Sequence, residues 1–389
     1  MGNGLESWQR SAIRNSMERY RRAQDDYYAG GKPLAEVDGG FKAFSLVSPP
    51  LGAPATRRRI RQIVDNMVQG GHGATAIAAR TPHVATIAVT YNCQCDCGHC
   101  SAVDYQRETS RNGHALTYEE LKSAIEQSVD LGTTCVILTG GEPLLHPRIC
   151  DLISAVDRSR SVCTLFSNGE LLTEKNVSRL KQAGLYGLYL SLDHADAALH
   201  DQNRRRPGLF EKATRGLRLC REAGILTGIS TYATREKMQN GELDALMDVA
   251  RDLQVLEVFL FDVIPTGRLS DHRECLLTDE EAGQIIEFRK KYAEKSDYPR
   301  IVHQTMFASI AYPCVAEGCP AAMVQLHLRA NGEVSPCDFT PFSFGNIRRK
   351  SLREIWESMA GNPLYAQPSA RCRLSRPDFW VQLDKVAVR

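Results

Sequence analysis

The most informative stretch of this chain is HVATIAVTYNCQCDCGHC, residues 83–100, in which an apolar run typical of a buried strand leads directly into four cysteines. Three of them, Cys93, Cys97 and Cys100, have the spacing C-x3-C-x2-C. Thiolates gathered this closely indicate metal or iron–sulfur ligation. A four-iron cube held by three thiolates leaves one iron free to bind and activate another molecule.

Zinc is the alternative for this cysteine cluster, because Cys93, Cys95, Cys97 and Cys100 together supply the four thiolates of a structural zinc site. Such sites usually join two knuckles across a longer loop, whereas all four cysteines here lie within residues 93–100. Spacing and context therefore favour the iron–sulfur cluster.

Outward from this stretch, the sequence alternates between strand and helix patterns. Six strand–helix pairs are predicted: 83–90 with 118–131, 135–139 with 147–158, 162–167 with 174–183, 187–192 with 210–223, 226–233 with 242–253, and 256–263 with 278–292. Such pairs require a parallel sheet with right-handed crossovers. We therefore expect an α/β fold, a partial (β/α)6 TIM-type barrel over residues 81–298, with functional residues just after each strand.

The second strand ends in Gly140-Gly141-Glu142-Pro143, one strand–helix unit after the cysteine triad. Together these motifs resemble the radical S-adenosylmethionine (radical SAM) superfamily. The resemblance implies a [4Fe-4S] cluster on Cys93, Cys97 and Cys100, with Cys95 an ordinary loop residue. It also implies S-adenosylmethionine as cofactor, cleaved to a 5'-deoxyadenosyl radical that abstracts hydrogen from substrate carbon, and an external electron donor of the flavodoxin or ferredoxin type.

Further site residues follow from the same resemblance. The glycines of the Gly140–Pro143 motif would let the methionine end of the cofactor approach, and Glu142 with nearby carbonyls would receive its ammonium group. His99 would lie near the adenine. The ribose and the carboxylate would be met by strand-end and helix residues, namely Ser167, Asn168, Ser191, Asp193 and Arg204, and the backbone of 265–268 would border the adenine. Singly, the short polar residues could equally be helix N-caps.

The pattern changes in the C-terminal part, residues 299–389. Alternating residues 324–329 and the pair Asn331-Gly332 predict a hairpin, and Ser351 with Glu354 caps a final helix. Cys319 and Cys337 flank the hairpin as C-x12-G-x4-C, which resembles the SPASM/Twitch extension. The dense cysteine run of SPASM is missing, which favours the shorter Twitch form, a small α+β module. Four thiolates could hold one auxiliary cluster: Cys314, Cys319, Cys337 and Cys372. Alternatively, Cys314 and Cys372 are incidental.

The N-terminal part, residues 1–80, is predicted as a helical leader beside the main domain, and its basic run 57–61 as a solvated helix face. The formal net charge of +2 favours neither nucleic acid nor an anionic membrane as partner. Neither a membrane span nor a secretory signal is evident, so a cytoplasmic location is expected. The chain's 13 cysteines, an odd count, argue against a disulfide framework. Those within apolar patterns should be buried hydrophobes: Cys135, Cys150, Cys163 and Cys220.

The substrate is the least determined feature. The preferred hypothesis is oxidation or epimerisation of a small polar metabolite, such as a sugar or aminocyclitol of natural-product biosynthesis. Cys275, in the loop after the sixth strand, could return a hydrogen atom in an epimerisation, although an inert loop cysteine explains it as well. The alternative substrate is a ribosomally synthesised peptide. A catalytically silent cluster-binding protein is a third hypothesis, which formation of 5'-deoxyadenosine would exclude.

Overall fold

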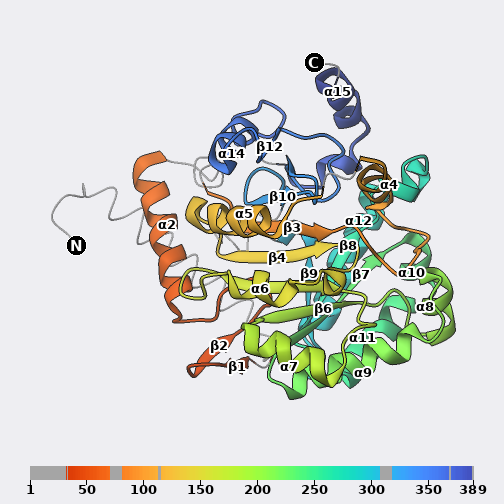
Figure 1. Ribbon diagram of the computed structural model, residues 1–389. Coiled ribbons are helices and arrows are strands. Elements are labelled where there is room, and N and C mark those ends of the chain that lie inside the picture. Colours follow the sequence, from red (N-terminus) through yellow and green to blue (C-terminus); the bar gives the residue numbers. More distant parts are fainter. Residues whose placement is uncertain are drawn as a thin grey trace.

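The computed structural model describes residues 32, 34–70, 81–112, 115–306, 318–367 and 369–387. Its main element is a ten-stranded sheet in the order β12-β11-β10-β3-β4-β5-β6-β7-β8-β9 (Figure 1). Eight neighbours in it run parallel: β10 (Gln325–Leu328), β3 (Val84–Thr90), β4 (Cys135–Gly140), β5 (Val162–Ser167), β6 (Gly187–Ser191), β7 (Leu226–Ala233), β8 (Glu257–Asp262) and β9 (Arg300–His303). The predicted α/β barrel architecture is confirmed.

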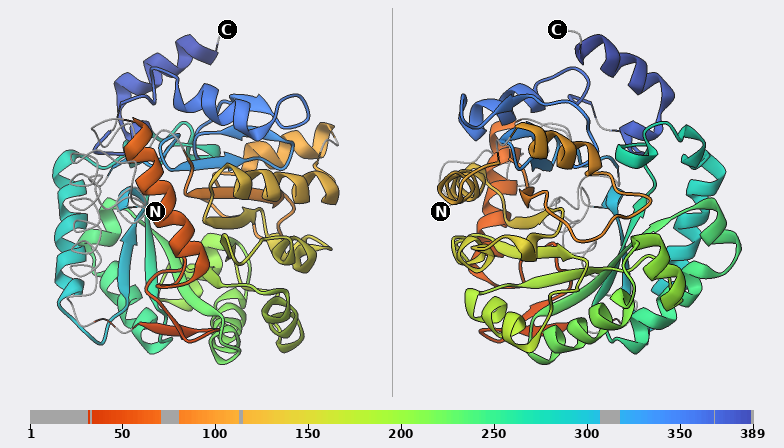
Figure 2. Two further views of the ribbon diagram at one scale, coloured as in Figure 1. Left: turned by 90° about the vertical axis from the view of Figure 1, so that its left-hand side faces the viewer. Right: turned by 45° about the vertical axis from the view of Figure 1, so that its right-hand side comes forward.

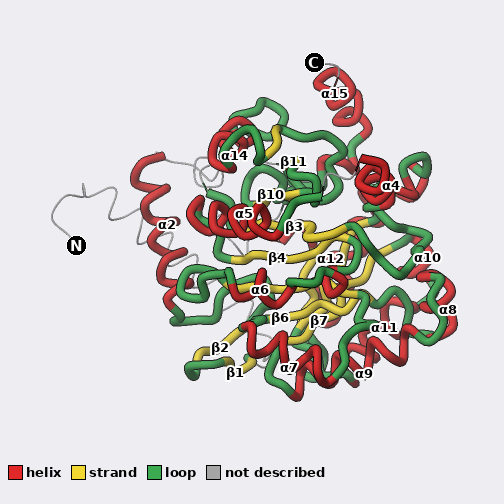
Figure 3. Tube along the Cα trace, in the orientation of Figure 1, coloured by secondary structure: helices red, strands yellow, loops and turns green. Residues whose placement is uncertain are grey.

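Helices cover the outer face of this curved sheet (Figure 3). They are α5 (Tyr118–Leu131), α6 (Ile149–Ser154), α7 (Glu174–Ala183), α9 (Leu209–Glu222), α11 (Glu242–Asp252) and α12 (Asp279–Ala293). Three further helices lie near the carboxyl ends of the strands: α4 (Val103–Asn112), α8 (Ala197–Arg204) and α10 (Arg235–Gln239). Capping boxes begin α5 at Thr117 and α12 at Thr278, as the sequence pattern of Thr followed three residues later by Glu requires. A large apolar core between sheet and helices includes Ile87, Leu138 and Leu188.

The N-terminal part is more than the predicted helical leader. It contains a hairpin of β1 (Ala35–Val37) and β2 (Phe41–Ala43) before α2 (Pro54–Gly70). Residues 43–47 then pack inside the barrel, where Leu46 shares an apolar cluster with Tyr189 and Phe259. The buried carboxylate of Glu257 accepts hydrogen bonds from the Leu46 amide (2.8 Å) and from the Tyr189 hydroxyl. This segment therefore closes the end of the barrel opposite the strands' C-termini.

The basic run on α2 is solvated only in part: Arg57 and Arg61 are exposed as predicted, whereas Arg58 and Arg59 face the barrel. Arg58 donates hydrogen bonds to the backbone oxygens of Val129 (2.5 Å) and Thr133 (3.2 Å), and the buried Arg59 contacts His83. These contacts fasten α2 across the barrel wall, and Figure 2 shows the helix lying along that side of the molecule. Residues 1–31 of the predicted helical leader lie outside the described residues.

The C-terminal hairpin is continuous with the barrel sheet. β10 pairs antiparallel with β11 (Glu333–Ser335), as predicted, but also parallel with β3 in the register Thr86↔His327. The predicted boundary at 298/299 falls just before β9, inside the same sheet. β12 (Gly345–Asn346), α14 (Leu352–Ala360), η5 (Arg373–Ser375) and α15 (Pro377–Ala387) complete the module. The helix capped by Ser351 is therefore α14, and α15 follows it. Within the described residues, no helix is long and apolar enough to cross a bilayer.

Candidate active site

The loop that follows β3 carries the cysteine triad and is clamped by backbone hydrogen bonds at the carboxyl ends of other barrel elements. The amides of Asp96 and Gly98 donate to the carbonyls of Arg204 (3.2 Å) and Asn203 (3.1 Å), at the end of α8. The amide of Arg268, in the turn after β8, donates to the Cys100 carbonyl (3.0 Å). The segment 265–268 predicted to border the adenine thus lies against the cluster loop.

The thiols of the triad lie in an environment that favours thiolates at two positions. A hydrogen bond from Cys95, and then the charge of Arg204, lower the pKa of Cys93 to about 6 and lower that of Cys97. Burial raises the pKa of Cys100 to about 11. Within the described residues, no three His, Cys, Asp or Glu side chains close around a single metal ion. A four-iron cube is larger than one ion, so its thiolates lie farther apart than those of zinc.

The glycines of the Gly140–Pro143 motif bring β4 against the cluster loop. Gly140 has a positive φ of 136°, and a Cβ there would lie 2.0 Å from the Thr90 carbonyl oxygen. At Gly141 a Cβ would lie 2.4 Å from the Asn92 carbonyl oxygen. Instead, the Gly141 amide donates to Thr90 at 2.8 Å. Glycine is needed at both positions so that β4 can lie directly against the backbone of residues 90–92, which lead into the cluster loop. The sequence had instead suggested that these glycines make room for the cofactor.

Glu142 is fully buried and ties the ends of two strands together. Its carboxylate accepts hydrogen bonds from the Ser167 hydroxyl (2.9 Å), the Asn168 amide (2.8 Å) and the Leu144 amide (3.0 Å). Burial raises its pKa to about 7, partly offset by these hydrogen bonds. Pro143 opens the short η1 (Pro143–Leu145). The Asn168 side chain in turn places its Nδ2 3.9 Å from the Cys93 sulfur, so the motif, the third strand end and the triad form one unit.

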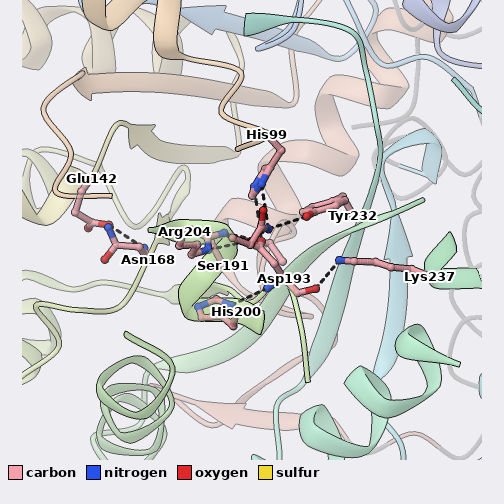
Figure 4. Close-up of polar contacts among 11 residues, drawn as sticks. His99, Glu142, Asn168, Ser191, Asp193, His200, Arg204, Tyr232 and Lys237 are labelled. Carbon is pink, nitrogen blue, oxygen red and sulfur yellow. Dashed lines mark hydrogen bonds and ion pairs between the residues drawn. The ribbon is translucent and has the colours of Figure 1, made fainter. Parts of the chain in front are cut away.

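Asp193 and Arg204 form a buried bidentate ion pair at the centre of the site (Figure 4). The Arg204 Nε and Nη2 atoms donate to Asp193 at 2.9 and 2.8 Å. Burial by itself would raise the pKa of Asp193, but the charge and hydrogen bonds of Arg204 together with the charges of neighbouring histidines outweigh it, so the pKa is lowered. Both residues were predicted as cofactor contacts. The structure shows that Arg204 is engaged by Asp193, while Ser191 lies partly exposed beside Ser230 (hydroxyl oxygens 3.4 Å apart).

Three further side chains join this network although the sequence analysis did not single them out. The Asn203 amide nitrogen lies 3.0 Å from Asp193, 2.9 Å from the Tyr232 hydroxyl and 3.3 Å from His99 Nδ1. His99 and Tyr232 place their ring centroids 4.6 Å apart. Lys237 donates to the Asp193 carbonyl and lies 3.8 Å above the Tyr232 ring (Figure 4). Tyr232, near the end of β7, could have been found by its strand-end position.

The C-terminal cysteines come together from three segments. Cys319 precedes β10, Cys337 follows β11 and Cys372 precedes η5. A hydrogen bond from Cys372 lowers the pKa of Cys319 to about 6 and raises that of Cys372, and burial raises the pKa of Cys337 to about 12. Cys314 lies outside the described residues. Cys319 and Cys337 are buried and Cys372 is partly buried, so these three thiols are placed to ligate a buried iron–sulfur cluster.

Cys275 ends the short η3 (Arg273–Cys275) in the connection from β8 to α12. It is partly buried, and burial raises the pKa of its thiol. The thiol therefore stays protonated at neutral pH, which is the form that holds a transferable hydrogen atom. Its role as a hydrogen donor stays a prediction.

Two family models match this chain. One is the radical SAM superfamily, over residues 87–269, and the other is the SPASM iron–sulfur cluster-binding domain, over residues 319–373. The second match carries the SPASM description, whereas the sequence pattern had favoured the shorter Twitch form. The first region begins within β3, shortly before Cys93, and the second begins at Cys319.

Curated relatives agree with these family matches. The AdoMet-dependent heme synthase of Methanosarcina barkeri is 28% identical over 71% of this chain and 82% of its own length. The PqqA peptide cyclase of Rhizobium meliloti is 26% identical over 77% of this chain and 80% of its own length.

Solved structures show the same fold. SuiB of Streptococcus suis bound to its precursor peptide SuiA superposes with a TM-score of 0.59 at 18% identity, covering 80% of this chain and 69% of that one. Native anSMEcpe with AdoMet and a peptide gives 0.56 at 16% identity, covering 78% and 94%. The enzyme thus uses S-adenosylmethionine and [4Fe-4S] clusters, one of them auxiliary. This chain belongs to the radical SAM superfamily and carries a C-terminal SPASM iron–sulfur domain.

Proposed function

We propose that this enzyme oxidises a ribosomally synthesised peptide at a carbon atom. Bound together, the core cluster and S-adenosylmethionine supply a 5'-deoxyadenosyl radical that removes a hydrogen atom from the substrate. The peptide replaces the small polar metabolite favoured by the sequence as the preferred substrate. The observation that carries the proposal is that peptides appear in both kinds of comparison, among the curated relatives and among the solved structures.

We assign the cofactor sites by the predicted residues. Cys93, Cys97 and Cys100 would hold the core cluster. The four C-terminal cysteines, with Cys314 among them, would hold the auxiliary cluster. S-adenosylmethionine would lie along the strand ends from Gly140–Pro143 to Ser191, with His99 and its partner Tyr232 on one side. In this arrangement Glu142 and the Asp193–Arg204 pair act as positioning residues, because the chain itself already occupies their polar atoms.

A polar wall on the inner face of the sheet supports a substrate rich in amide groups. Side chains alternate along β3 and β10, so Thr86 and His327 face inward where Ile87 and Leu328 face the outer core. Asp338 accepts hydrogen bonds from Gln325 (2.8 Å) and Thr86 (3.1 Å), lies 3.1 Å from His327, and keeps 30% of its side chain exposed. Burial would raise its pKa, but His327 holds it low, so the carboxylate is ionised and can accept a peptide N–H.

A tetrapyrrole is the second candidate substrate. The observation that favours it is the match to AdoMet-dependent heme synthases, which spans 82% of the length of two of them. A related Fe-coproporphyrin III synthase also matches, over 79% of its length.

One experiment separates the two candidates. The full-length protein, reconstituted anaerobically and reduced with dithionite, is given S-adenosylmethionine with either short peptides encoded beside its gene or Fe-coproporphyrin III. We expect 5'-deoxyadenosine formation together with loss of two hydrogens from a peptide, seen by mass spectrometry, and neither with the Cys97→Ala variant. Turnover of Fe-coproporphyrin III with unaltered peptides would overturn the peptide assignment in favour of the tetrapyrrole.

A further inference from the structure

The buried cysteines of the C-terminal module are surrounded by hydrogen-bond donors and a positive charge. Cys319 and Cys337 are almost completely buried, and both belong to the main apolar core. Three polar side chains from separate segments reach into this apolar surrounding: Thr340, Tyr365 and Arg373. Buried polar groups are costly unless they have hydrogen-bond partners, so three of them beside the thiols indicate that an acceptor is bound there.

Thr340 makes direct contact with a predicted cluster ligand. Its Oγ1 lies 3.2 Å from the Cys337 sulfur, and its backbone amide donates to the Cys337 carbonyl at 3.2 Å. The Thr340 carbonyl accepts from Arg329 Nη2 at 2.9 Å, which fixes this turn from the other side. A cysteine that ligates iron has no proton left to donate. The Thr340 hydroxyl must then be the donor in this contact.

Tyr365 is 2% exposed, with Phe344 and Phe379 packed edge-on at centroid distances of 6.0 and 5.8 Å. Within the described residues, its buried hydroxyl has no hydrogen-bond partner. Burial raises its pKa, so the hydroxyl keeps its proton. The phenol is therefore a buried, protonated donor that lies near the Cys337 thiol and the Thr340 side chain.

Arg373 adds a buried positive charge over the Tyr365 ring. Its guanidinium carbon lies 5.4 Å from the Tyr365 ring centroid, and its Nη2 donates to the Gln367 carbonyl. Its Nε is buried without a partner in the described part of the chain. An anionic iron–sulfur cluster would place negatively charged acceptors beside these buried donors.

We propose that Thr340, Tyr365 and Arg373 stabilise the reduced auxiliary cluster and raise its reduction potential. Hydrogen bonds to the sulfurs and nearby charge are the means by which proteins set the potential of such clusters, because reduction adds negative charge that donors offset. The three residues are positioning residues: they act through the cluster. The proposal depends on the auxiliary cluster and is independent of which substrate the enzyme takes.

The test is an EPR-monitored redox titration of the reconstituted full-length protein. S-adenosylmethionine added to the sample perturbs the core cluster, so the signal that it leaves unchanged reports the auxiliary cluster. We expect Thr340→Val and Tyr365→Phe each to shift this signal to a more negative midpoint potential. A tenfold change in the oxidised-to-reduced ratio at fixed potential corresponds to 59 mV for this one-electron couple.

Two control variants bound the interpretation. Thr340→Ser keeps the hydroxyl and should keep the wild-type potential. Tyr105→Phe removes a hydroxyl that donates to the Thr340 carbonyl at 3.4 Å and leaves the Thr340 hydroxyl in place, so it should leave the potential unchanged. Wild-type potentials in both test variants, at wild-type iron content, would overturn the proposal. So would loss of iron in both with the fold intact by circular dichroism, because the residues would then serve cluster retention.

Discussion

Replacing Asp193 with Asn tests whether the buried ion pair holds the active site together. The Asp193 side chain is 1% exposed and binds Arg204 through two hydrogen bonds of 2.9 and 2.8 Å. Removing one partner of a buried pair costs about 3–5 kcal/mol, because the remaining charge is left uncompensated. Asn keeps the shape and one acceptor, so we expect a loss near the lower limit, about 3 kcal/mol of unfolding free energy.

The same substitution should weaken cofactor cleavage. The carbonyls of Arg204 and Asn203 accept hydrogen bonds from the Asp96 and Gly98 amides of the cluster loop, so a displaced Arg204 moves the loop that holds the triad. We therefore expect Asp193→Asn to lower the rate of 5'-deoxyadenosine formation even at temperatures where the variant stays folded.

The assay is anaerobic urea unfolding followed by circular dichroism, with Asp151→Asn as the matched control. Asp151 pairs with Arg148 at 2.7 Å, but the two side chains are 51% and 47% exposed, so solvent screens the pair and the loss should be much smaller than at Asp193. Because the pKa of Asp193 is lowered on folding, its stabilisation exists above its unfolded pKa and disappears as the pH falls. The wild-type and Asp193→Asn curves should therefore converge in acid. A loss no greater than that of Asp151→Asn at neutral pH would refute the reasoning.

Three other predictions follow from single sites. Gly141→Ala should lower the unfolding free energy by more than about 1 kcal/mol and reduce iron loading, because the new Cβ would lie 2.4 Å from the Asn92 carbonyl oxygen. The control is Gly283→Ala, where the new Cβ meets open space. Equal stability of the two variants would contradict this account. Burial raises the pKa of Glu142 to about 7, so the protonated carboxyl stabilises the fold fully below its unfolded pKa, and this stabilisation is lost as the pH rises through 7. The unfolding midpoint measured from pH 4 to 8 should therefore change less with pH in Glu142→Gln than in the wild type. A hydrogen-donor role of Cys275 would make the reaction a redox-neutral epimerisation in place of the proposed oxidation. Deuterium from D2O would then enter the product of the wild type but not of Cys275→Ala, and an unlabelled wild-type product rules the role out.

The local sequence pattern was sufficient to predict much of the fold and the edge of the sheet at which the site lies. The apolar periods of 83–292 predicted six strand–helix pairs, because burial of one face imposes a repeat that can be read within each element. Since parallel strands end at the same edge, residues from Cys93 to Asp193 could be expected to meet although they lie far apart in sequence. The structure brings Glu142, Asn168 and Cys93 into contact accordingly.

Only the tertiary structure decided which of these polar groups are available to a ligand and which are occupied by the chain. Arg204 is engaged by Asp193, and Glu142 by Ser167 and Asn168, because each pair meets across strands and helices whose side-chain directions no local pattern encodes. The same holds for Leu46, which reaches Glu257 in the barrel, and for β10, which pairs with β3. The last two contacts join residues more than 200 positions apart, so they depend on the shape of the assembled barrel, whereas strands, helices and cysteine spacing depend on neighbouring residues alone.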